Sequence, residues 1–148
     1  MALLGHRVVH TELMIPAPPA AIWAVLTDPP GYAEWNPIFV HVEGTYAEGA
    51  TMRYRMRDHT GKESDVTSSV LRFEPESELR QFGGIRGVLT FEHQWLLDAM
   101  DGGTRVTQHE EYRGIGVWFW DSSWVEPAYA RANEALRERM ARLEAARR

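Results

Sequence analysis

The residue with the clearest potential for proton transfer is His93. It lies between Phe91 and Trp95 in the stretch FEHQW, where residues two apart share one face of a β-strand. An imidazole on such an apolar face can take or give a proton near neutral pH. The simpler alternative is a core histidine that is hydrogen-bonded to a neighbour.

Glu110 is the second candidate for acid–base chemistry. If it faces inward together with Val106, apolar surroundings would raise the pKa of its carboxyl. A slip of one residue in the register would instead turn Thr107, His109 and Glu111 toward the interior. The plainer interpretation is a carboxylate that pairs with an arginine or reaches the mouth of a pocket.

A tight turn is expected to bring these two side chains together. Asp101-Gly102 is a strong hairpin signal, and it separates two runs, 88–97 and 104–113, that alternate like strands. His93 and Glu110 would then lie on neighbouring strands and close to one another. We therefore treat both as candidate catalytic residues.

Aromatic side chains supply candidate ligand contacts. The hydroxyls of Tyr54 and Tyr112 could position a carbonyl or a phenol, although both tyrosines are also ordinary wall residues whose hydroxyl finds a partner. In VWFWDSSW (117–124), Trp120 and Trp124 are four residues apart, as on one face of a helix. This cluster could gate a pocket, bind an aromatic ligand, dock on a second subunit or a membrane, or be buried under the sheet.

Other reaction classes find little support. His109, Glu110 and Glu111 offer metal ligands, but neighbouring residues on a strand point to opposite faces, so they do not form one site. The glycine-rich stretches 83–87 and 114–116 match neither a phosphate-binding loop nor a dinucleotide fingerprint, and no G-x-S-x-G elbow occurs. We expect no metal and no bound cofactor.

Length and composition are those of one soluble globular domain spanning residues 1–148. The chain has no cysteine, which fits a cytoplasmic location, and its start has only four apolar residues before Gly5, too few for a signal peptide. No apolar run approaches the roughly 20 residues that span a bilayer. The net charge is −5 and the basic residues are dispersed, so we expect no nucleic-acid partner.

The periodicity predicts one strand, two short helices, about six antiparallel strands and a long final helix. In TMRYRMRD, Met52, Tyr54 and Met56 alternate with arginines, so one face should be buried and the other should face water. The expected strands are 7–15, 38–45, 51–58, 64–74, 79–83, 88–97 and 104–113, and the expected helices are 20–28, about 30–35, and about 120–146 with a regular part that starts nearer 125 because of Pro127.

Three segments resemble the START-like, or SRPBCC, superfamily, and in particular its polyketide cyclase/dehydrase and lipid-transport branch. They are IPAPPAAIWAVLTDPPGYAEWNPIF (15–39), GGTRVTQHEEYRG (102–114) and ANEALRERMARLE (132–144). The resemblance implies an α+β helix-grip fold, in which a bent antiparallel sheet of about seven strands wraps around the long C-terminal helix. It also implies a hydrophobic cavity between sheet and helix, with the two short helices closing one end.

Three functions follow as hypotheses. The first is binding of a small hydrophobic or aromatic molecule, such as a lipid, a quinone or a polyketide, in that cavity. The second is a cofactor-free cyclase or dehydratase that uses His93 and Glu110, and the third is an interaction protein that uses residues 117–124, for instance as a homodimer. The residues expected to contact a ligand are Trp35, Phe39, Met52, Tyr54, Met56, Phe91, His93, Trp95, Glu110, Tyr112, Trp120, Trp124, Tyr129 and Asn133.

Overall fold

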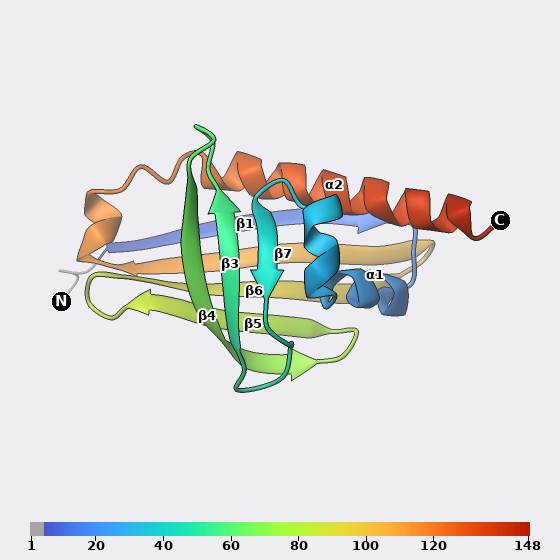
Figure 1. Cartoon of the computed structure of the whole chain (residues 1–148), viewed down its shortest axis with the longest axis horizontal. Coiled ribbons are helices and arrows are strands. Elements are labelled where there is room, and N and C mark those ends of the chain that lie inside the picture. Colours follow the sequence, from blue (N-terminus) through green and yellow to red (C-terminus); the bar gives the residue numbers. More distant parts are fainter. Residues whose placement is uncertain (1–4) are drawn as a thin grey trace.

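A computed structural model describes residues 5–148 as one curled antiparallel sheet that wraps around a long C-terminal helix (Figure 1). The α+β helix-grip fold expected from the sequence is confirmed, with seven strands. The apolar residues 1–4, on which the expectation about the N-terminus rests, lie outside the described part. In chain order the elements are β1 (Gly5–Ile15), α1 (Pro19–Leu26), η1 (Pro29–Glu34), β2 (Phe39–Glu43), β3 (Thr51–Arg57), β4 (Glu63–Glu74), β5 (Glu78–Ile85), β6 (Leu89–Met100), β7 (Gly103–Gly114), η2 (Ile115–Trp118) and α2 (Val125–Ala146).

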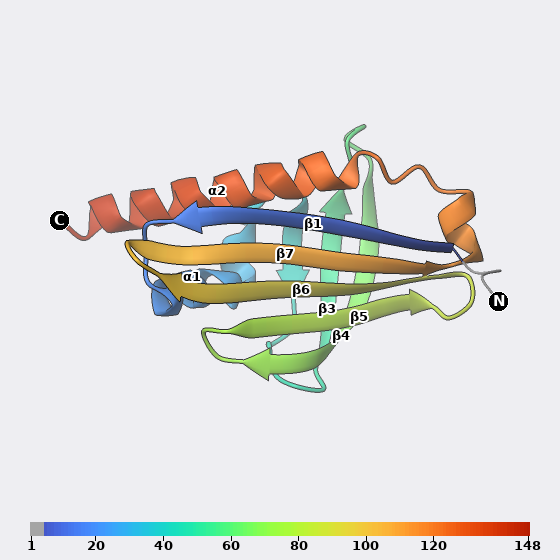
Figure 2. The same ribbon diagram turned by 180° about the vertical axis from the view of Figure 1, so that it is seen from behind.

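The strands lie in the order β1-β7-β6-β5-β4-β3-β2, and every neighbouring pair is antiparallel. Strands β2, β3 and the first part of β4 run steeply across β5, β6 and β7, and β4 then bends to lie along β5, which gives the sheet its curl (Figure 1). The view from behind shows β1, β7, β6 and β5 side by side, with α2 along the β1 edge (Figure 2). Met100 pairs with Gly103, so Asp101-Gly102 forms the expected two-residue connection.

An apolar stripe along one side of α2 holds this helix against the rest of the molecule. Its buried residues are Val125, Ala128, Tyr129, Ala132, Asn133, Leu136 and Met140. They recur every three or four residues, so they line one side of the helix and face the sheet and the short helices. Within residues 5–148, no helix combines the length and the apolar character needed to cross a membrane.

The final helix begins later than position 120, which was the first of the two expected starts. Residues 115–118 form the separate 3-10 helix η2, which the sequence did not suggest, and α2 begins at Val125. Between them, the carboxylate of Asp121 accepts hydrogen bonds from the backbone N–H and the hydroxyl of Ser123, at 3.1 and 2.7 Å. Because this local turn competes with a helix, Trp120 lies outside α2 and the expected helical pairing of Trp120 with Trp124 is wrong.

Prolines mark the positions at which the two short helices begin. Pro19 is the first residue of α1, where its missing N–H is not needed, and Ile22 and Leu26 are fully buried on its inner side. The hydroxyl of Tyr32 in η1 donates to the carbonyl oxygen of Leu26 at 2.6 Å and so ties the two helices together. Asp28 directly precedes η1 and makes no side-chain capping hydrogen bond.

Asn36 starts the sheet after these helices. Its Oδ1 accepts hydrogen bonds from the backbone N–H groups of Ile38 and Phe39, both at 2.9 Å, and the residue is buried. Pro37 keeps Asn36 out of the α region, so the chain turns from η1 into β2. The Trp35-Asn36-Pro37 element is therefore a folding device.

Replacing Asn36 with alanine should lower the free energy of unfolding by about 1–3 kcal/mol. The change leaves the backbone N–H groups of Ile38 and Phe39 without their acceptor. Urea unfolding measures the loss, and Asn36→Asp, which keeps an acceptor oxygen, should recover part of it. Equal stabilities of Asn36→Ala and the wild type would show that these bonds do not hold the turn.

Candidate functional site

The interior of the grip contains a small cavity of about 40 Å³, which is enclosed by the inner face of the sheet together with Tyr32 and Asn36 and is lined by no residue of α2. Its lining residues are Tyr32, Asn36, Phe39, Tyr54, Val66, Ser68, Gln81, Phe91, His93, Trp95 and Glu110. The sequence-based expectation was a hydrophobic cavity between the sheet and the C-terminal helix, and the structure places the cavity against η1 and β2 instead. This one is small and partly polar, because large aromatic side chains fill the grip and polar side chains project between them.

Glu110 is the buried acid of this site. It is 3% exposed and is the direct cross-strand partner of His93, so the inward register is the one the chain adopts. The hydroxyls of Tyr112 and Tyr129 both donate to its Oε1. Burial raises the pKa of the Glu110 carboxyl, although His93 and the two tyrosine hydrogen bonds act in the opposite direction.

His93 lies next to Glu110 and is held in one orientation. Its Nε2 is 2.9 Å from Oε1 of Gln108, and its ring packs edge-on against Trp95 and Tyr129. The amide nitrogen of Gln108 donates to Oδ1 of Asn133 at 2.7 Å, so the oxygen of Gln108 is free to accept. The network therefore assigns the proton to Nε2 of His93 and leaves Nδ1 with a lone pair. His93 is both a hydrogen-bonded core histidine and a wall of the cavity.

A second polar group lies across the cavity. Oε1 of Gln81 accepts hydrogen bonds from the hydroxyls of Tyr54 and Ser68, at 2.6 and 2.7 Å. The hydroxyl oxygens of Tyr46 and Tyr54 are 2.8 Å apart and form a further hydrogen bond. Burial raises the pKa of Tyr54 to about 12. These hydroxyls stay protonated at neutral pH and act as hydrogen-bonding groups rather than bases.

Six of the residues expected to contact a ligand line the cavity: Phe39, Tyr54, Phe91, His93, Trp95 and Glu110. Tyr112 and Tyr129 lie behind Glu110, and Asn133 reaches the site only through Gln108. Met52 and Met56 pack into the apolar clusters around the site without lining the cavity.

Trp35 lies elsewhere, in a larger groove of about 1080 Å³ between α1 and the C-terminal part of α2. Its neighbours Tyr32 and Asn36 line the interior cavity instead. The indole Nε1 of Trp35 is buried and has no hydrogen-bond partner. Trp35 packs on Tyr32, with ring centroids 5.1 Å apart, so it lies between the outer groove and a residue that lines the interior cavity.

The tryptophans of residues 117–124 have different surroundings. Trp120 packs edge-on against Tyr112, with ring centroids 4.8 Å apart, and Trp124 stacks on His59 at 5.3 Å. The exposed members of the cluster are Trp118 and Phe119, at 65% and 87%. The expected homodimer stays a prediction.

Sequence reasoning also missed Val66, Ser68 and Gln81. In VTSSV, Val66, Ser68 and Val70 alternate, and Gln81 is two residues after the buried Leu79, so a period of two identifies the inner side of β4 and β5. Gly83 is needed beside them, because a Cβ there would lie 2.5 Å from the ring of Phe91. The alternation of residue types along β4 and β5 therefore indicates that Val66, Ser68 and Gln81 face inward.

A curled antiparallel sheet that grips a C-terminal helix around a small interior site defines a helix-grip protein. The chain belongs to the polyketide cyclase / dehydrase and lipid transport family, whose model matches residues 6–141. No curated protein matches the sequence.

Solved structures agree on the fold. A protein from Rhodobacter sphaeroides superimposes with a TM-score of 0.77 at 17% identity, covering 95% of this chain and 99% of that one. The Zhui aromatase/cyclase from Streptomyces sp. R1128 gives a TM-score of 0.73 at 18% identity, with 93% and 95% covered. Ara h 8.0201 superimposes with a TM-score of 0.70 at 17% identity, covering 93% of this chain and 99% of that one. At these identities the likeness concerns the fold alone.

Proposed function

We propose that the protein binds a small hydrophobic or aromatic molecule in the interior cavity between η1 and the inner face of the sheet, with an oxygen atom of the ligand at Glu110. The observation that carries this proposal is a buried carboxyl with a raised pKa in the wall of a cavity otherwise rich in aromatic rings. A protonated carboxyl donates a hydrogen bond to a carbonyl or phenol oxygen, and aromatic walls match a flat apolar body. The family description, which includes lipid transport, supports the same class of ligand.

The size of the cavity sets a condition on binding. At about 40 Å³ it is far below the roughly 300–1,000 Å³ of usual ligand pockets, so side chains must move for a ligand to enter. Phe39 and Phe91 are lining aromatic residues that are only half-buried, unlike Trp95. We therefore place the opening movement at Phe39 and Phe91.

Native mass spectrometry with a panel of apolar aromatic compounds, beginning with whatever co-purifies, tests this proposal. Val66→Leu adds volume inside the cavity and should weaken binding by about tenfold or more. Ala24→Trp, at an exposed position of the outer groove, is the matched control and should leave affinity unchanged. Binding that is lost in Ala24→Trp and kept in Val66→Leu would move the site to the groove.

A cyclase or dehydratase activity is the second candidate, because Glu110 and His93 are cross-strand partners in one cavity wall. A protonated Glu110 would give a proton to a leaving hydroxyl or an enolate oxygen, and the Nδ1 lone pair of His93 would accept one. Glu110→Gln and His93→Ala should then abolish turnover while ligand affinity stays within a few-fold. Normal turnover in both variants would leave binding as the function.

A further inference from the structure

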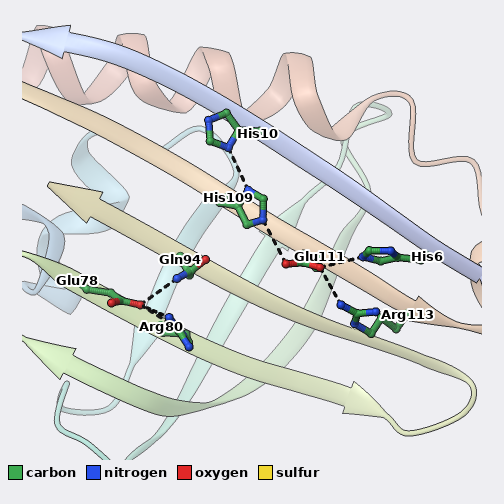
Figure 3. A network of polar contacts seen from close by, with 8 residues as sticks. All are labelled: His6, His10, Glu78, Arg80, Gln94, His109, Glu111 and Arg113. Atoms are coloured by element: carbon green, nitrogen blue, oxygen red, sulfur yellow. Dashed lines mark hydrogen bonds and ion pairs between the residues drawn. The ribbon is translucent and has the colours of Figure 1, made fainter. Parts of the chain in front are cut away.

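A second pair of titratable side chains lies on the outer face of the sheet, behind Glu110. His10 of β1 and His109 of β7 are direct cross-strand partners, and their Nδ1 atoms are 3.0 Å apart. The two rings face each other across the strands, and Glu111 lies beside His109 (Figure 3). Both rings are partly open to solvent, so a small ion in water can reach them.

The opposite nitrogen of each ring is directed at a carboxylate. Nε2 of His10 is 2.8 Å from Oε2 of Glu12, and Nε2 of His109 is 3.3 Å from Oε2 of Glu111. Because carboxylates accept, each Nε2 donates, and the two facing Nδ1 atoms are the nitrogens left to bind a further proton or a cation. Two bare Nδ1 lone pairs 3.0 Å apart would repel each other, so either a shared proton or a metal ion between the rings is needed.

We propose that His10 and His109 form a site for a divalent transition-metal ion such as Cu²⁺ or Zn²⁺, bound through the two Nδ1 atoms. Imidazole nitrogens suit these ions, and two nitrogens that each lie about 2.0–2.1 Å from one ion are roughly 3 Å apart. The pairing of each ring with a carboxylate is the arrangement that orients metal-ligating histidines and increases their basicity.

The site is an open one. Among residues 5–148, no group of three or more His, Cys, Asp or Glu side chains is arranged to hold a metal ion, so water would complete the coordination. The ring planes lie at 69° to each other, and each ring has to tilt slightly for both lone pairs to meet at the ion. Arg105 also contacts Glu12, and Arg113 also contacts Glu111. Each carboxylate therefore lies between an arginine and one of the two histidines.

Binding of such an ion would link the edge strand β1 to β7, directly behind the cavity wall that carries Glu110. The sequence did not suggest it, because Glu110 and Glu111 were the only ligands considered for His109. The second nitrogen comes instead from a residue 99 positions earlier, which only the β1–β7 register brings alongside.

Calorimetric titration of untagged, metal-free protein with Cu²⁺ tests the proposal, with electron paramagnetic resonance to detect nitrogen ligands. We expect one ion per chain, and an affinity at least tenfold lower in His10→Ala and in His109→Ala. Glu12→Gln removes an orienting carboxylate and should weaken binding by about 10–100-fold. His41→Ala is the matched control, since His41 also bonds a carboxylate two residues away, Glu43 at 3.0 Å, but has no facing histidine in its described contacts.

The substituted residues lie on the outer face, so the variants should keep the wild-type unfolding midpoint in the presence of a chelator. A wild type that binds Cu²⁺ no tighter than the His10→Ala, His109→Ala double variant would overturn the proposal and leave the pair with a shared proton only. A loss of binding in His41→Ala as large as in His10→Ala would overturn it as well.

Discussion

Glu110→Gln is expected to remove a large part of the loss of stability that the protein shows as the pH rises above 4.5. The folded state holds the Glu110 proton more tightly than the unfolded state, because burial raises the pKa of the carboxyl above 4.5. The stability that this tighter proton binding contributes is therefore fully present below pH 4.5 and is lost as the pH rises through the folded-state pKa of Glu110. The loss amounts to about 1.4 kcal/mol per pH unit in that interval. Glutamine does not titrate, and its Oε1 can still accept from Tyr112 and Tyr129.

Urea unfolding at a series of pH values, with a chelator present, measures this difference. Glu63→Gln is the control, because hydrogen bonds from Arg57 and Arg55 lower the pKa of the exposed Glu63 carboxyl. Stability from Glu63 is lost as the pH falls, so this variant should follow the wild-type slope above pH 4.5. A Glu110→Gln variant whose stability runs parallel to that of the wild type would show that Glu110 is not a protonated buried acid.

Leu136→Ala should produce the largest loss of stability, about 2–5 kcal/mol. Leu136 is 0% exposed and lies in the middle of the α2 stripe, packed in the cluster that includes Ile22, Leu26 and Trp95. Removing its side chain leaves a hole that a rigid sheet on one side cannot collapse to fill. The midpoint of urea or thermal unfolding measures the effect.

Leu143→Ala provides the comparison on the same helix stripe. Leu143 is half-buried and borders the outer groove, so the same chemical change removes less buried surface and opens no enclosed hole. Its loss should be less than half of that at Leu136. Equal losses at the two positions would mean that the sheet grips the whole of α2 evenly and not mainly its middle.

Most of the fold could be predicted because each element carries its own local signal. Alternation in TMRYRMR marks β3, the prolines mark the starts of α1 and η1, and Asp101-Gly102 marks the last hairpin. The start of α2 was less certain, since the aromatic residues before Val125 look like a continuing helix until the turn at Asp121 is seen.

The site could be predicted only in part. Alternation correctly suggested that Glu110 and His93 share the inner face, and the hairpin made them neighbours. The hydrogen bonds that decide their chemistry come from distant residues, such as Tyr129 to Glu110. No local pattern encodes those contacts, nor the small volume left after the aromatic side chains have packed.

Nuclear magnetic resonance of the tryptophan indole N–H groups during ligand titration tests most directly whether the interior cavity is the binding site. Trp95 lines that cavity and Trp35 lines the outer groove, so two signals of the same kind report on the two places. Trp95→Phe and Trp35→Phe assign the signals. Our account predicts that the tightest-binding compound shifts the Trp95 signal and leaves that of Trp35 in place. A shift at Trp35 with none at Trp95 would contradict it.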